Sequence, residues 1–522
     1  YRYVIHAVVA LGVLVVLPLG IGAATSLFAG SGEELRYVGL AHFAEILTAR
    51  GAPLLSSGSF YLVLLVTLLW TAVNVALHVV IGAGLALLLA RSEGADVSDI
   101  AKATAKLEAG HTLLSRALQV LTDAKSRAEI EPSLLLLQRV INAFPKGAMQ
   151  QGGDDEEDPW LYFYEHFLAA YDPKLRKDSG VYYTPVQVVK CQVALVDDLL
   201  RNRLGKPDGF THKGVITLDP AVGTGTYLLG VIDHAMDAVE RSQGAGAVAG
   251  KATALAANIY GFEWMTGPYA VSELRLTRAL KDRGASIPKD GTGIYLADTL
   301  ESPHGQPPNL PQYLDAIAGQ HKRALLVKDK KAVIVCLGNP PYDRHDAVQY
   351  VGNNVALSDR SRTGGWVRWG DEGDPAGPIL SSFIEPAKNG GHGGDLKNLY
   401  NLYVYFWRWA IWKVFEHPPL LDTGKRAVKG DNAGVVTFIT AASYIRGDAF
   451  VGMREMLRRL CHEVYIIDLG GEGRGTRQDD NVFNIQTPVA ICIAVREGKK
   501  DKESPATVKY AAIRGTRPWA RS

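Results

Sequence analysis

The hydrophobic pattern beyond Pro159 alternates between short apolar runs, typical of buried strands, and longer amphipathic stretches, typical of helices. This alternation predicts an α/β fold, with a doubly wound, mainly parallel, Rossmann-like sheet covered by helices. Four of the apolar runs, Val215 to Leu218, "ANIYGFEW", "GIYLADTL" and Val333 to Val335, lead into the polar residues Asp219, Glu263, Asp298 and Asn339. Because parallel strands end at the same edge of a sheet, these four side chains predict a single crevice.

The N-terminal region has a different pattern. Tyr3 to Gly30 and Gly58 to Ala90 contain no Asp, Glu, Lys or Arg, and each stretch is long enough to span a bilayer. We expect two transmembrane helices here, and two buried core helices are the alternative. Arg2 and Arg91 flank the two spans and favour a hairpin with both ends in the cytoplasm. The catalytic part of the chain would then also face the cytoplasm.

The rest of the chain divides by composition. Residues 93–158 have an amphipathic helical pattern and end in the acidic run "GGDDEEDP", which we interpret as a solvated linker. The predicted domains are the hairpin at 1–92, this helical segment at 93–158, a catalytic domain at 159–500 and a short tail at 501–522. Residues 343–395 are rich in glycine and lack a regular period, which predicts a long loop next to Asn339.

Composition narrows the function classes. A net charge of +2 over 522 residues describes a globular protein that is not strongly basic, so a nucleic-acid partner must be held by a local patch. The four cysteines, Cys191, Cys336, Cys461 and Cys492, form no C-x-x-C pair. Their spacing argues against a zinc site or a disulfide framework, so we expect small core residues in a reducing compartment and no metal.

The turn after the first strand indicates a cofactor. Gly223 and Gly225 in "DPAVGTGTYLL" allow a ligand to approach the backbone, and the following helix start offers unpaired N–H groups. A simple tight turn is the alternative, and the missing third glycine disfavours a nicotinamide cofactor. Glu263 could accept from the two ribose hydroxyls of an adenosine-containing cofactor, or be a surface acid. Asp298 could accept from an adenine amine, or cap a helix.

The stretch "NPPY" predicts a site for an exocyclic amine. Such an amine is a poor nucleophile because its lone pair is delocalised into the ring, and two acceptors beside its hydrogens would favour electron density on nitrogen. The Asn339 side-chain oxygen and the Pro340 carbonyl are suitable acceptors, since Pro341 restricts Pro340 to an extended conformation. Tyr342 then offers an aromatic face on which a base can stack.

Together, "GVYYTP", "DPAVGTGTYLL", "YGFEW", "LADTL", "NPPY" and "NVFNI" resemble, in this order, the motifs of an N6-adenine DNA methyltransferase that uses S-adenosylmethionine. The likeness extends to the modification segment of large single-chain restriction-modification enzymes. It implies that Tyr183, Thr184 and Pro185 border the cofactor, and that Asp219, Pro220, Ala221, Gly223 and Gly225 surround its amino-acid part. It further implies ribose binding by Glu263 and adenine contact by Asp298. Asn339 and Pro340 would hold the target amine, with Pro341 fixing the Pro340 carbonyl. Tyr342 and Phe483 would pack on the flipped base, and an ordinary core position is the alternative for Phe483.

The implied reaction is direct transfer of the sulfonium methyl group to adenine N6 in DNA, in which Cys336 has no role as a nucleophile. The target-recognition, helicase and nuclease modules of the resembled enzymes have no counterpart in this sequence. Residues 1–92 instead resemble the start of a sugar-type ABC transporter permease, which suggests a fusion near Ser92 or a misjoined assembly. Two rival functions remain open: methylation of a glutamine amide in proteins, and an inactive truncated remnant.

Overall fold

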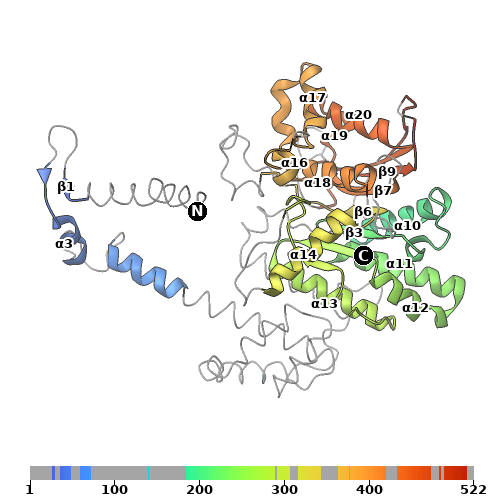
Figure 1. Cartoon of the computed structure of the whole chain (residues 1–522), viewed down its shortest axis with the longest axis horizontal. Helices are drawn as coiled ribbons and strands as arrows, with labels where there is room; N and C mark the ends of the chain where they lie inside the picture. The colour runs from blue at the N-terminus through green and yellow to red at the C-terminus, as the bar shows by residue number, and fades with distance from the viewer. Residues whose placement is uncertain are drawn as a thin grey trace. The chain divides into compact units, whose positions relative to one another are not determined.

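A computed structural model describes most of the C-terminal two thirds of the chain and short parts of the N-terminal third (Figure 1). The described residues are 26–29, 36–48, 59–71, 139, 184–288, 291–305, 315–342, 363–374, 377–418, 432–471, 481–483, 487–501 and 503–513. Contacts divide the chain into two units, Tyr1–Leu85 with Pro132–Leu137, and Ala86–Glu131 with Gln138–Ser522. Each unit is described by itself.

The described part of the first unit contains a two-stranded antiparallel ribbon and two helices. Strand β1 (Phe28–Ala29) pairs with β2 (Arg36–Tyr37), α3 covers Ala41–Thr48, and residues 60–71 are helical. The expected spans at 3–30 and 58–90 lie largely outside the described residues. In the parts of them that are described, no helix is both long enough and apolar enough to cross a membrane. The membrane hairpin and the permease resemblance therefore stay predictions.

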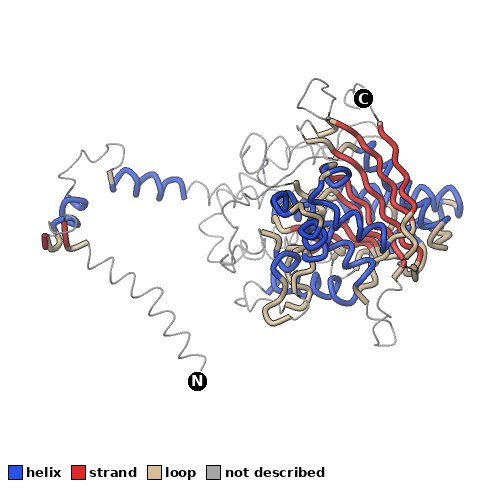
Figure 2. The backbone as a smooth tube through the Cα atoms, turned by 90° about the horizontal axis from the view of Figure 1, so that it is seen from above, coloured by secondary structure: helices blue, strands red, loops and turns tan. Residues whose placement is uncertain are grey.

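The second unit is built on an eight-stranded mixed sheet, drawn in red in Figure 2, with the strand order β10-β8-β9-β7-β6-β3-β4-β5. The strands are β3 (Thr217–Asp219), β4 (Ile259–Glu263), β5 (Ile294–Leu296), β6 (Val335–Gly338), β7 (Ala433–Ala441), β8 (Glu463–Gly470), β9 (Val489–Glu497) and β10 (Thr507–Ala512). All neighbouring pairs are parallel except those of β9 with β7 and β8. The predicted α/β class with a mainly parallel sheet is confirmed.

Helices cover both faces of this sheet. One face packs against α10 (Val186–Asn202), α11 (Thr226–Gln243), α12 (Ala245–Ala256) and α13 (Thr266–Asp282). The other packs against α14 (Asp315–Lys330), α16 (Gly365–Trp369), α17 (Ser381–Asn389), α18 (Leu402–Ile411), α19 (Ser443–Arg446) and α20 (Val451–Leu460). In β6, the side chains of Val335 and Leu337 lie in the core between the sheet and α10 to α13, whereas Cys336 lies in the core on the opposite face. Successive side chains thus alternate between two buried faces, which explains the continuous apolar run in the sequence.

The segment 343–395 is not one long loop, as the sequence suggested. Its described part contains α16 and α17, and Trp366 and Phe383 are buried in the core. The first helix has five residues and the second has nine with Pro386 inside it, so neither is long enough to show a clear hydrophobic period. Residues 343–362 lie outside the described part.

One cysteine also differs from expectation. Cys336, Cys461 and Cys492 are buried, but Cys191 is exposed. The buried residues of α10 include Val189, Val193 and Val196, which repeat at helical spacing, and Cys191 lies off this stripe. The sheet also continues past residue 500, because β10 pairs in parallel with β8. The predicted domain boundaries at 92 and 158 lie outside the described residues and stay predictions.

Candidate active site

The candidate site lies where the strand order reverses. Chain connections run outward from β3 through β4 to β5 on one side, and β6 lies against the other side of β3. In open α/β sheets, ligands bind beyond the carboxyl ends of the strands at such a reversal. Asp219 ends β3, Glu263 ends β4, and Asn339 follows the last residue of β6. The sheet therefore brings these three predicted residues to one edge.

The glycine turn connects β3 to α11. Gly225 has φ 91°, and a Cβ there would approach Leu276 Cδ1 of α13 to 2.5 Å, so this position requires glycine. Gly223 has φ 53°, and a Cβ there would meet nothing closer than Ala221 O at 4.0 Å. Gly223 thus adjoins open space, whereas Gly225 allows α11 and α13 to pack closely.

Two carboxylates beside this turn are buried without a cation. Asp219 is 1% exposed and accepts a hydrogen bond from Ala221 N at 3.0 Å. Glu263 accepts from Gly223 N at 3.0 Å and from Met265 N at 2.9 Å. Burial raises the pKa of Asp219 to about 8, with a further rise from the charge of Glu263, and burial raises the pKa of Glu263 to about 7. Among the described residues, no lysine or arginine pairs with either carboxylate.

These two buried acceptor groups fit S-adenosylmethionine. Its amino-acid part carries an ammonium group, which would supply the cation that the carboxylates lack, and its ribose carries two hydroxyl donors. Open space at Gly223 would admit it beside the backbone. The exposed indole of Trp264, which directly follows Glu263 and is 57% exposed, is a further candidate contact that the sequence reasoning missed. An apolar aromatic next to a strand-terminal acid is the signal that could have found it.

Asp298 lies in the turn after β5. Its carboxylate accepts from Leu300 N at 2.9 Å, and its carbonyl accepts from the fully buried Lys328 Nζ at 2.5 Å. Lys328 also donates to Glu301 O at 3.3 Å. Asp298 therefore stabilises the turn, a local role similar to the helix capping that the sequence offered as the alternative. Its contact with the cofactor stays a prediction.

Side-chain hydrogen bonds hold Asn339. Its Nδ2 donates to Thr184 Oγ1 at 3.0 Å, and the Tyr342 hydroxyl donates to its Oδ1 at 2.6 Å. Ile439 O lies 3.1 Å from the same hydroxyl. Burial raises the pKa of Tyr342 well above its usual value, so the hydroxyl keeps its proton. Asn401, which the sequence reasoning missed, caps α18 and donates to Tyr342 O at 3.3 Å.

Two aromatic rings flank Tyr342. The Phe483 ring lies 6.1 Å from it and the Tyr403 ring lies 6.4 Å from it, both edge to face. Phe483 is 8% exposed, and its N–H donates to Asn481 Oδ1 at 2.8 Å. The structure thus brings the two predicted base-stacking residues together. Tyr183 lies outside the described residues, while Pro185 directly precedes α10.

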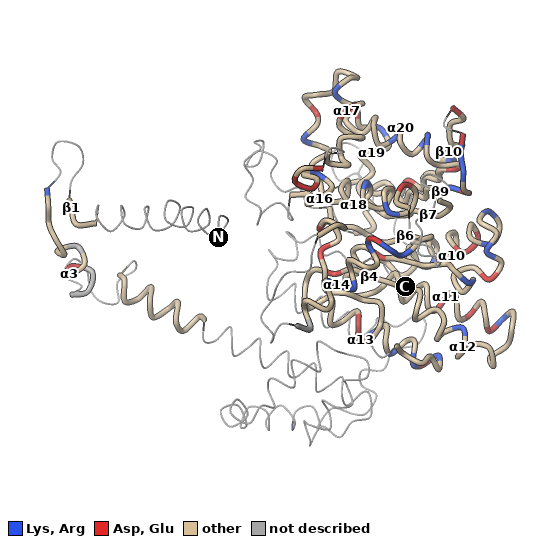
Figure 3. The backbone as a smooth tube through the Cα atoms, viewed as in Figure 1, with Lys and Arg blue, Asp and Glu red and all other residues tan. Residues whose placement is uncertain are grey.

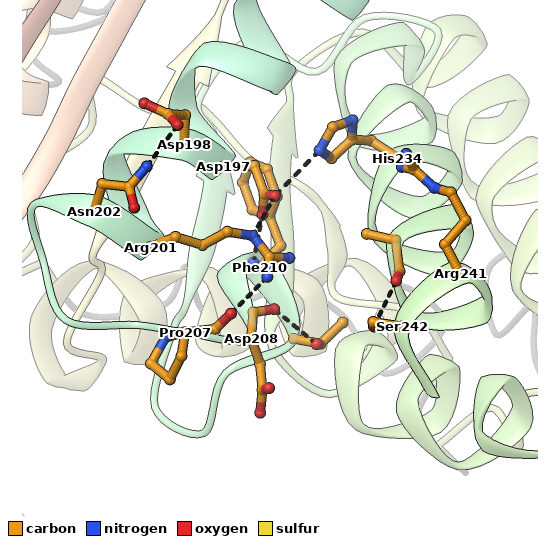
Figure 4. A network of polar contacts seen from close by, with 12 residues as sticks. Asp197, Asp198, Arg201, Asn202, Pro207, Asp208, Phe210, His234, Arg241 and Ser242 are labelled. Carbon is orange, nitrogen blue, oxygen red and sulfur yellow. Dashed lines mark hydrogen bonds and ion pairs between the residues drawn. The ribbon is translucent and has the colours of Figure 1, made fainter. Parts of the chain in front are cut away.

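Helix α10, which starts directly after Pro185, is anchored by the polar network in Figure 4. Asp197 accepts from Arg201 Nε at 2.7 Å and from Phe210 N at 3.2 Å, and its Oδ2 lies 3.3 Å from His234 Nε2 of α11. Burial raises the pKa of this carboxyl, but the bonds from His234 and Arg201 outweigh it, so the pKa of Asp197 lies below its usual value. The network ties α10 to α11 and to the short helix η3 (Gly209–Thr211).

Comparison with family models gives a match over residues 157–364 to a family described as N-6 DNA Methylase. Residues 157–364 are therefore similar to this family. This match covers every predicted site residue except Phe483, and it confirms the resemblance expected from the sequence. The family implies S-adenosylmethionine as the methyl donor. A comparison with curated proteins found no match.

Solved structures share the fold of this chain. The DrdV-DNA complex, solved by cryo-electron microscopy, is 20% identical with a TM-score of 0.56 over 84% of this chain and 37% of that chain. The ATP-dependent Type ISP restriction-modification enzyme LlaBIII, bound to DNA, is 21% identical with a TM-score of 0.57 over 79% of this chain and 25% of that one. The matched part of this chain therefore spans 37% of the length of the first of these chains and 25% of the second.

Proposed function

We propose that this chain transfers the methyl group of S-adenosylmethionine to the N6 amine of a flipped adenine in DNA, as the modification part of a restriction-modification system. The observation that carries the proposal is the placement of Asn339, directly after β6, at the same sheet edge as the two buried carboxylates Asp219 and Glu263 that end β3 and β4. The match to the N-6 DNA methylase family supports the same reaction.

The cofactor supplies a methyl group on a positively charged sulfur. In the proposal, Asp219 binds its ammonium group, and Glu263, held rigid by two backbone N–H groups, accepts from its ribose hydroxyls. The surroundings are buried, so little water competes with these bonds. The turn that includes Pro220 and Ala221 sets the direction of approach.

In the proposal, Asn339 Oδ1 and the Pro340 carbonyl accept the two hydrogens of the adenine amine. This arrangement raises the electron density on N6 as its bond to the methyl carbon forms and the carbon–sulfur bond breaks. One amine proton is then released to solvent, which leaves a neutral methylated amine. Tyr342 and Phe483 hold the base in place by contact with its face.

No protein nucleophile takes part. Cys336 is fully buried, and burial raises the pKa of its thiol well above the usual value. A thiol that stays protonated inside the core is unsuited to covalent attack on a base. The proposed reaction is therefore a single direct displacement, and positioning of the two substrates supplies most of the acceleration.

The test is transfer of labelled methyl groups to unmethylated DNA by the full chain, followed by nucleoside analysis. N6-methyladenine that disappears in Asn339→Ala, but not in Asn202→Ala, would support the proposal, because Asn202 lies in α10 with only a local bond to Asp198. Labelled glutamine in a peptide acceptor, with no label in DNA, would instead support the protein-methylating alternative. A folded chain that binds the cofactor and labels neither acceptor would favour the inactive remnant.

The partners follow from the proposed reaction. DNA is the proposed substrate, and basic and acidic residues are interspersed over the described helices and strands (Figure 3), so binding would rely on local contacts. The solved chains are about two to three times longer, which supports additional target-recognition, helicase or nuclease modules as partners. A cytoplasmic location, with anchoring through residues 3–30 and 58–90, completes the proposal.

A further inference from the structure

Thr184 makes a contact that its predicted position beside the cofactor does not explain. The residue lies just before α10 and is 155 positions away from Asn339 in the sequence. Its hydroxyl nevertheless accepts from Asn339 Nδ2 at 3.0 Å, and it is only 5% exposed. A buried hydroxyl that binds a predicted acceptor residue restricts the rotation of that side chain.

We propose that Thr184 is a positioning residue for Asn339, and this proposal rests on the proposed function. The Asn339 amide rotates about two single bonds, and misplacing its oxygen by even about 1 Å would cost a large part of the rate. The Thr184 hydroxyl fixes one end of the amide, while the Tyr342 hydroxyl binds the other end. The amide plane is thereby set before a base arrives.

Thr184 can serve this role because α10 gives it a rigid base. Arg201 and His234 approach Asp197 in Figure 4 and hold the second half of the helix. Nearer to Thr184, Gln192 Nε2 donates to Thr437 Oγ1 of β7 at 2.9 Å. The Tyr227 hydroxyl of α11 donates to Gln192 Oε1 at 3.0 Å. These bonds connect α10 to α11 and to β7, which pairs with β6, the strand directly before Asn339.

The test replaces the hydroxyl by a methyl group of similar size. We expect Thr184→Val in the full chain to lower kcat for DNA methylation about tenfold to a hundredfold, with KM for S-adenosylmethionine changed less than about twofold. Thr184→Ser keeps the hydroxyl and should retain most of kcat. Thr211→Val is the matched control, because the Thr211 hydroxyl donates to Asp208 O away from the site and should leave both constants unchanged.

Other outcomes separate the explanations. A raised KM for the cofactor with unchanged kcat in Thr184→Val would overturn the positioning role and favour direct cofactor contact. Equal losses of kcat in the Ser and Val variants would also overturn it, because a hydroxyl would then have no special part. If Thr184→Val fails to fold, the Ser variant and an Ala variant, compared by the same two constants, decide the question. An inactive wild-type chain would contradict the proposed function itself.

Discussion

The two halves of the candidate site are held in different ways. On the half proposed to bind the cofactor (the cofactor half), Asp219 and Glu263 accept from backbone N–H groups, all within their own turn or the neighbouring one. On the half proposed to bind the base (the base half), Asn339 is held by the side chains of Thr184 and Tyr342. The backbone therefore builds the first half almost by itself, whereas the second depends on side chains and on helix packing. Substitutions in the cofactor half should therefore change cofactor affinity, whereas substitutions in the base half should change the kinetics of DNA methylation.

Gly338 is where the two halves touch, so its replacement should have the largest effect. With φ 156°, it would direct a Cβ to 2.6 Å from Asp219 Oδ1. We expect Gly338→Ala to destabilise the fold by about 1–3 kcal/mol and to reduce both cofactor binding and methyl transfer severely. Thermal unfolding and calorimetric cofactor titration provide the measurements.

Gly246 in α12 is the control for that change. A Cβ there meets nothing within 4 Å, so Gly246→Ala should stabilise the helix by up to about 1 kcal/mol without changing cofactor affinity. If Gly338→Ala behaves like Gly246→Ala, the close contact between the two halves does not constrain the site.

Glu263→Gln should affect the cofactor half alone. The glutamine side chain lacks the negative charge of the carboxylate that would accept from the ribose hydroxyls, and its NH2 group places a donor against a backbone N–H. We therefore expect the cofactor Kd to rise about tenfold to a hundredfold. Titration calorimetry measures this Kd, and the exposed Glu240 of α11 offers Glu240→Gln as the control. An unchanged Kd in Glu263→Gln would remove the proposed ribose contact.

pH should act on the same half through Asp219 and Glu263. Their pKa values of about 8 and about 7 lie above the usual range. These groups therefore contribute most to the stability of the ligand-free fold at low pH, and that contribution is lost as the pH rises towards 8. The ammonium group of the cofactor prefers the charged carboxylate, so the affinity for the cofactor should instead increase as the pH rises from about 6 towards about 8. We expect binding about fivefold weaker near pH 6.5 than near pH 7.8, with no further gain above that pH, because the α-amine of the cofactor itself then loses its proton.

Calorimetry across this range, in buffers of equal ionic strength, gives the profile. Asp219→Asn should flatten most of it, since the amide does not titrate. A wild-type affinity that stays constant from about pH 6.5 to about pH 8.5 would show that neither carboxylate changes its charge on binding.

Phe483→Leu should give the smallest effect, confined to the base half. Leucine keeps the apolar bulk but loses the aromatic face, so we expect KM for DNA to rise about threefold to tenfold while cofactor affinity stays the same. Phe450 is the matched control, because it stacks on Tyr403 rather than on Tyr342. Equal effects of Phe450→Leu and Phe483→Leu on DNA methylation would assign Phe483 to general core packing.

The same difference between the halves explains what the sequence could predict. Asp219 and Glu263 are visible in the sequence because each ends an apolar run, and strands at the centre of an α/β sheet carry such runs. The strand near Asn339 was predicted at Val333 to Val335 and is observed at Val335–Gly338, because the partners in β3 and β7 define where pairing starts. Such a shift depends on tertiary contacts.

The base half was less accessible from sequence. No local pattern links Thr184 to Asn339, and the bond between them exists only after α10 packs on the sheet. Asn401 could have been recognised as a helix cap before an aromatic run, but its bond to Tyr342 O spans 59 positions. Side-chain contacts between distant segments follow from the fold and have no signature of their own in the sequence.

The Tyr342 hydroxyl has a consequence for how a substrate enters. It lies within reach of two acceptors, Asn339 Oδ1 at 2.6 Å and Ile439 O at 3.1 Å, and it has one hydrogen to donate. An arriving amine that displaces it from Asn339 leaves it able to bond to the strand carbonyl instead. The Tyr342 hydroxyl thus keeps a hydrogen-bond partner when Asn339 Oδ1 turns to the amine, and this exchange leaves no buried hydroxyl unpaired.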